Sequence, residues 1–120
     1  MRVLIGIEDS DRGMQALEAA AERAREAGDE ITVAVYTVTE ESLEETAGAV
    51  RDRIKTLGID ADIRRIESEP GSRLVELAER EEYDQIVLSG GQRSPLGKIN
   101  LDSVHEFVLL NAQTTVTLVR

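Results

Sequence analysis

Short apolar runs alternate with longer amphipathic segments along all 120 residues, and this alternation constrains the fold most. The runs have the length and β-branched composition of strands, and they lie at residues 3–7, 31–38, 61–66, 85–89 and 114–119. The first two are almost continuously apolar, as expected of parallel strands covered on both faces, whereas the third is more polar and suits a sheet edge. The pattern predicts a parallel sheet with right-handed helical crossovers, that is, a three-layer α/β sandwich with five strands and four helices.

The four segments between the runs each predict a helix with one apolar face. The second is the clearest, because its apolar residues recur at intervals of four, three, four and three: Leu43, Ala47, Val50, Ile54 and Leu57. Ser42 and Glu45 form a capping box before it, and Ser103 with Glu106 repeats that motif before the fourth helix. The fourth helix is expected to bury Val104, Phe107 and Val108.

Glycine and proline mark where the helices begin and end. Gly28 and Gly58 follow the first two helices, in the place where a left-handed cap is common. Pro70 opens the third helix, where its missing N–H costs nothing.

The composition indicates one domain over residues 1–120 with an aliphatic core. Apolar residues make up 41% of the chain, but only two tyrosines and one phenylalanine are aromatic. No segment approaches the roughly 18 apolar residues of a membrane span, and the apolar start is too brief for a signal peptide. We therefore expect a cytoplasmic protein without membrane contact.

The charge balance excludes several classes of partner. Fourteen basic and 24 acidic residues give 14 − 24 = −10, which argues against nucleic acid and anionic membranes. The absence of cysteine removes disulfides, thiol catalysis and cysteine-ligated zinc. Only Lys55 and Lys98 are lysines, and this arginine-weighted acidity resembles proteins of salt-loving cytoplasms; a GC-rich genome is the alternative explanation.

The last third of the chain places a glycine-bearing loop directly after an apolar strand. Open α/β sheets bind ligands at this carboxyl end of their strands. RVLIGIEDSDRGMQALEAA, ITVAVYTV, EPGSRLVELAEREEYDQIVLSG and the remainder together resemble the universal stress protein family over almost the full length. The resemblance implies a Rossmann-like fold, similar to that of the adenine-nucleotide α-hydrolases, with strand order 3-2-1-4-5.

The family's nucleotide signature is only partly matched. That signature is Gly, two residues, Gly, nine residues, Gly, then Ser or Thr. With Ser103 in the last place, its three glycine positions fall on Ser89, Gln92 and Asp102. Such glycines permit close approach of the backbone to phosphates, and Gln92 adds a side chain there instead.

Asp102 is the largest departure. A carboxylate before the first turn of a helix is attracted to the same N–H groups as a phosphate. We expect Asp102 to substitute for the phosphate; the alternative is a helix cap turned to solvent. Gly90 and Gly91 can restore some flexibility to the loop, and the common Arg93–Ser94 pair is retained.

The first strand adds further candidate contacts. Glu8 stands where the family commonly has an Asp that reaches the ribose or adenine, Asp9 replaces a Gly, and Ser10 matches. Thr37 aligns with a main-chain contact to adenine. A retained site would then comprise Glu8, Ser10, Thr37, Ser89, Gly90, Gly91, Gln92, Arg93, Ser94, Asp102, Ser103 and Val104.

Other motifs give no catalytic or metal-binding residue. Gly91 to Lys98 misses the Walker A spacing by one residue, and Ile99 replaces its Ser or Thr. A phospho-receiver domain needs an Asp where Ser89 stands. His105 is expected at the surface or an interface rather than as a base, and the glutamates of residues 40–45 as a solvated helix start.

The closing strand is the expected dimer interface. Its residues are β-branched or apolar and include neither Pro nor Lys to deter strand pairing: Thr115, Val116, Thr117, Leu118 and Val119. The family commonly dimerises by antiparallel pairing of this strand, and the resemblance implies the same here; an edge shielded by helices is the alternative.

Two functions stay open. The first is a non-enzymatic stress-response or regulatory homodimer whose degenerate site holds no cofactor. The second is a switch that binds ATP or AMP with magnesium through an altered loop, with weak ATP hydrolysis as a further option.

Overall fold

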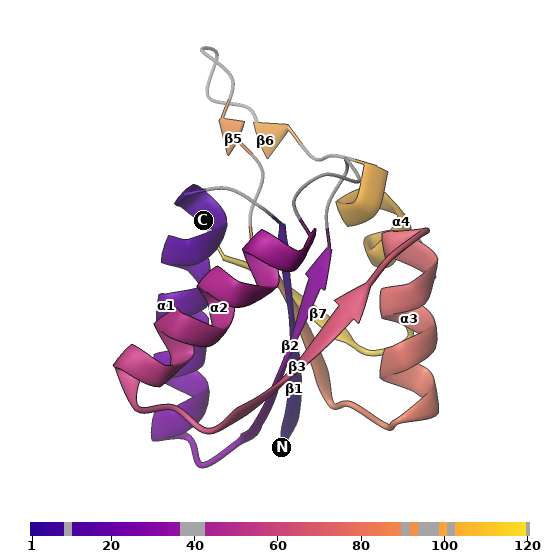
Figure 1. Ribbon diagram of the computed structural model, residues 1–120. Helices are drawn as coiled ribbons and strands as arrows, with labels where there is room; N and C mark the ends of the chain where they lie inside the picture. Colours follow the sequence, from indigo (N-terminus) through magenta and orange to yellow (C-terminus); the bar gives the residue numbers. More distant parts are fainter. Residues whose placement is uncertain (9–10, 37–42, 90–91, 94–98, 101–102, 120) are drawn as a thin grey trace.

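Five parallel strands form the sheet at the centre of the molecule (Figure 1). The computed structural model describes residues 1–8, 11–36, 43–89, 92–93, 99–100 and 103–119. The sheet order is β3-β2-β1-β4-β7, which confirms the expected order 3-2-1-4-5 because β7 is its fifth strand. The strands are β1 Arg2–Glu8, β2 Glu30–Tyr36, β3 Ala61–Ile66, β4 Gln85–Ser89 and β7 Thr115–Val119.

Four helices cover the two faces of this sheet, as expected. They are α1 Asp11–Glu26, α2 Leu43–Leu57, α3 Pro70–Arg80 and α4 Ser103–Asn111. A short antiparallel hairpin, β5 Gln92–Arg93 with β6 Ile99–Asn100, was not expected; in Figure 1 it projects beyond the carboxyl ends of the strands.

The period of two along each strand divides the core into two layers. Alternate residues of β1 (Val3, Ile5 and Ile7) pack with α1 and α2. Leu4, between them, packs on the other side with residues of α3 and α4 such as Leu74. The core is aliphatic, as expected, although both tyrosines are also buried in it.

Helix ends follow the local sequence signals. Gly28 and Gly58 have φ of 75° and 67°, the left-handed conformation in which glycine carries no steric penalty. Pro70 is the first residue of α3. Helix α4 begins at Ser103, so the position before it lies outside the described residues, as does Ser42 of the first box; both expected capping boxes stay predictions.

Candidate functional site

The carboxyl edge of the sheet brings together the ends of β1 and β4. These strands are parallel neighbours with Gly6 opposite Leu88, so Glu8 and Ser89, which end the two strands, lie at the same edge. The half-buried Glu8 is therefore at the edge where the sequence predicts a ribose contact. Gln92 and Arg93 form β5 beyond this edge (Figure 1).

The start of α4 supplies the other described candidates. Ser103 is exposed, whereas the Val104 side chain is buried in the same apolar cluster as Leu88 of β4. Val104 therefore has only its main chain to offer a ligand. The remaining nucleotide candidates, Ser10, Thr37, Gly90, Gly91, Ser94 and Asp102, lie outside the described residues, and their roles stay predictions.

His105 is not at the surface, contrary to the sequence-based expectation. Its side chain is only 3% exposed, and α4 turns Val104, His105 and Val108 inward. Phe107, which was expected in the core, is 39% exposed instead. The cause is the composition of α4: apolar residues lie all around this helix, so periodicity alone does not identify its buried face.

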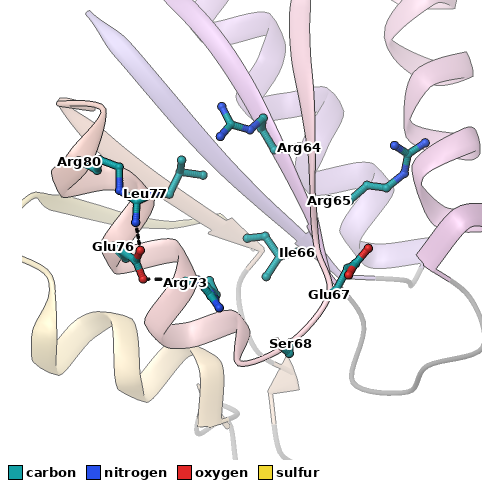
Figure 2. A pocket seen from close by; sticks show the side chains of 9 residues that line it. All are labelled: Arg64, Arg65, Ile66, Glu67, Ser68, Arg73, Glu76, Leu77 and Arg80. Atoms are coloured by element: carbon teal, nitrogen blue, oxygen red, sulfur yellow. Dashed lines mark ion pairs between the residues drawn. The ribbon is translucent and has the colours of Figure 1, made fainter.

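A pocket that the sequence did not predict lies between β3 and α3. Figure 2 shows this pocket, which has a volume of about 310 Å³. Its lining residues are mostly charged: Arg64, Arg65, Ile66, Glu67, Ser68, Arg73, Glu76, Leu77 and Arg80. Part of this lining could have been found in the sequence, because residues 73, 76, 77 and 80 are spaced so that they lie on one face of a helix.

Arg64 is the most firmly held of the pocket arginines. Its two Nη atoms donate to the two carboxylate oxygens of Glu81, at 3.1 and 3.0 Å. This hydrogen bonding raises the pKa of the Arg64 guanidinium despite the opposing effect of burial, so Arg64 stays charged. Arg65 lies on the other face of the strand and pairs with Glu44 of α2, Nε to Oε1, at 2.9 Å.

Comparison with known protein families identifies the chain. The model of the universal stress protein family matches residues 34–120. The chain belongs to the universal stress protein family.

Solved structures agree with this assignment over the whole length. A universal stress protein from Archaeoglobus fulgidus is 26% identical, with a TM-score of 0.82 over 100% of this chain and 98% of its own. A universal stress protein in complex with cAMP is 25% identical, with a TM-score of 0.80 over 100% and 96%. A universal stress protein from Archaeoglobus fulgidus in complex with dAMP, at 24% identity and a TM-score of 0.77 over 100% of this chain and 98% of its own, shares the fold. A search of the curated proteins found no match.

The described part of this universal stress protein contains no cluster of three or more His, Cys, Asp or Glu that could hold a metal ion. Within the same residues, none of the helices is long and apolar enough to cross a membrane.

Proposed function

We propose that this universal stress protein is a non-enzymatic stress-response protein that acts through protein contacts as a homodimer joined along β7. The observation that carries the proposal is the place of β7 at the end of the sheet, where it pairs with β4 on one side. Its other edge offers backbone N–H and C=O groups to a second copy, and such edges promote pairing unless they are protected. The family is generally regarded as non-enzymatic.

The surroundings of β7 favour a twofold contact. Val116 and Leu118 are half-buried and pack against the same cluster as Val108 of α4. On α4 itself, Leu109 is 41% exposed and Leu110 is 84% exposed. An antiparallel pair of β7 strands would satisfy the open edge in both copies through one self-complementary surface.

Two proline variants test this contact by sedimentation velocity. Consecutive residues of a strand direct their backbone groups to opposite sides, so of Val116 and Thr117 one faces β4 and the other the open edge. We expect the wild type to be a dimer. Of Val116→Pro and Thr117→Pro, we expect one to be a folded monomer and the other to lose stability because its proline breaks the β4–β7 ladder. Val116→Thr, which keeps the N–H, is the control and should remain a dimer. A wild-type monomer contradicts the proposal.

Adenine-nucleotide binding is the second candidate, favoured by the 25% identical relative that was solved with cAMP. Glu8 ends β1 at the carboxyl edge of the sheet, where the sequence predicts a ribose contact, and the sequence retains the glycine pair Gly90–Gly91. Against ATP or AMP with magnesium stands the role predicted for Asp102, because a carboxylate just before a helix is expected to compete with phosphate for its first N–H groups.

Calorimetric titration with ATP and AMP, with magnesium and at moderate and high salt, separates the two candidates. We expect no heat for the wild type and binding for Asp102→Gly, with about 1 kcal/mol of stability lost with the cap. Micromolar binding by the wild type would establish the second candidate. Equal affinities in the two proteins would remove Asp102 from the explanation.

A further inference from the structure

The pocket beside α3 runs along the free edge of β3. Its lining includes five consecutive residues, from Arg64 to Ser68. Successive side chains of a strand point to opposite faces, and Figure 2 shows Arg64 and Arg65 on opposite sides of β3. A hollow bordered by both must follow the strand's edge, and β3 is the terminal strand of the described sheet.

Helix α3 forms the second wall of this groove. Arg73, Glu76, Leu77 and Arg80 are spaced as one helical stripe, and this stripe lines the pocket. Ile66, which is 8% exposed, and the half-buried Leu77 supply the apolar part of the lining. An exposed strand edge beside a helix is the arrangement in which extended peptides bind by adding a strand to a sheet.

The charge of the groove is opposite to that of the whole molecule. Its lining holds four arginines and two glutamates, 4 − 2 = +2, whereas the chain carries −10. Arg64 and Arg65 are paired with glutamates outside the lining, so the arginines on the α3 side are the ones that an acidic ligand would meet. Glu76 is shared, because it pairs with Arg80 and also with Arg73, whose Nη1 is 3.7 Å from Oε2. Exposed pairs of this kind contribute roughly 0–1 kcal/mol, so an incoming carboxylate can replace Glu76 at little cost.

We propose that this groove binds an extended acidic segment of another protein, which adds to β3 as a further strand. The backbone of the segment pairs with the free edge of β3, and its acidic side chains, at alternate positions on the α3 side, meet Arg73 and Arg80. β3 has six residues, so at about 3.3 Å per residue it accommodates a segment of about six residues. This groove lies at the opposite end of the sheet from β7.

Fluorescence anisotropy with a labelled peptide tests the proposal on the full chain. The probe is an alternating glutamate–valine peptide of about eight residues, with a lysine–valine peptide of equal length as the charge control. We expect saturable binding of the acidic probe alone. The double variant Arg73→Glu with Arg80→Glu should weaken it by at least about tenfold, since two attractive contacts become repulsive. Arg51→Glu, an exposed change on α2, is the matched control and should have little effect.

A third probe separates strand addition from simple charge attraction. It has the acidic sequence but carries N-methyl groups on all of its backbone amides, so it keeps the charge and loses the backbone donors on both edges. We expect its binding to be lost. Equal binding of both acidic probes, or binding unaffected by the α3 double variant, overturns the proposal. So does failure of the acidic probe to bind at millimolar concentration, in which case the arginines serve only to protect the edge from pairing.

Discussion

At the scale of single residues, Gly6 of β1 lies where the core has no room for a side chain. A Cβ atom built there would lie 2.8 Å from Cδ2 of Leu88 and 3.4 Å from Cδ1 of Leu74. Both leucines are fully buried, so neither has free space into which to turn. Because Gly6 has no side chain, Leu74 of α3 and Leu88 of β4 can pack directly against the backbone of β1. Glycine in a strand interior often marks such a close approach.

Gly6→Ala should lower the free energy of unfolding by about 1–3 kcal/mol, since one added methyl overpacks the core. Gly48→Ala on α2 is the matched control, because nothing lies within 4 Å of its Cβ position. That change should stabilise by roughly 0.5–1 kcal/mol through helix propensity. Urea denaturation of both variants measures the difference. Equal free energies of unfolding for the two variants would show that Leu88 and Leu74 can move aside without destabilising the core.

A buried side-chain hydrogen bond links β2 to the start of β4. The Tyr83 hydroxyl donates to Oγ1 of Thr32 at 2.8 Å, and the Arg2 guanidinium carbon lies 4.5 Å from the centroid of the Tyr83 ring. Tyr83→Phe should cost about 1 kcal/mol. Thr32→Val should lower the free energy of unfolding less in the Tyr83→Phe variant than in the wild type, because the Thr32 hydroxyl has already lost its donor there. Additive losses in this double-mutant cycle would mean that the bond contributes nothing.

At the scale of elements, α4 is the helix whose exposure is least explained by a single copy of the chain. Apolar residues lie nearly all around this helix, but only one of its faces is buried. That face consists of Val104, His105 and Val108. Phe107, Leu109 and Leu110 remain exposed. An apolar helix with a solvent-facing side is typical of a surface that contacts another protein.

Leu110→Asp should therefore weaken the proposed β7 dimer by about tenfold, an effect of about 1.4 kcal/mol on association. It should change the stability of the monomer by no more than roughly 0.5 kcal/mol, because the side chain is 84% exposed. Concentration-dependent sedimentation measures the first effect and urea denaturation the second. Ala27→Asp, an exposed change after α1, adds the same charge as a control. Identical dimer affinity in both variants would place Leu110 outside the interface.

At the scale of the whole molecule, the net charge of −10 is confined to a body of 37 × 29 × 28 Å. The Debye length is about 30 Å at 0.01 M salt, so every charge on the molecule acts on every other. At about 1 M it falls to roughly 3 Å, and only direct pairs such as Arg64–Glu81 retain their attraction. Self-repulsion of the acidic surface therefore opposes the compact state mainly at low salt.

We expect Tm to rise between about 0.01 and 1 M sodium chloride, and a gain of ~1 kcal/mol corresponds to roughly 4 °C for a chain of this size. Glu22→Gln with Glu26→Gln, two exposed changes on α1, should reduce the salt dependence by removing part of the repulsion. Thermal melts followed by circular dichroism provide the measurement. A Tm that is independent of salt would leave the acidic composition without a role in stability.

The sequence by itself determined the sheet, the helix order and the place of the polar edge strand β3. These follow from short-range periodicity and from the handedness of crossovers, which few residues suffice to specify. It also named Glu8 and Ser89 in one candidate site, and the structure ends their two parallel strands at the same edge of the sheet. Their roles toward a nucleotide stay predictions.

Only the tertiary structure decided which side of α4 is buried, and it placed His105 inside and Phe107 partly outside. It alone brought the α3 stripe of Arg73, Glu76 and Arg80 against the edge of β3. Periodicity describes one element at a time, and it identifies a buried face only where apolar and polar residues are segregated. Which faces meet depends on long-range packing between elements, and in α4 and at the β3 edge that packing, rather than local pattern, determined the surface this protein presents.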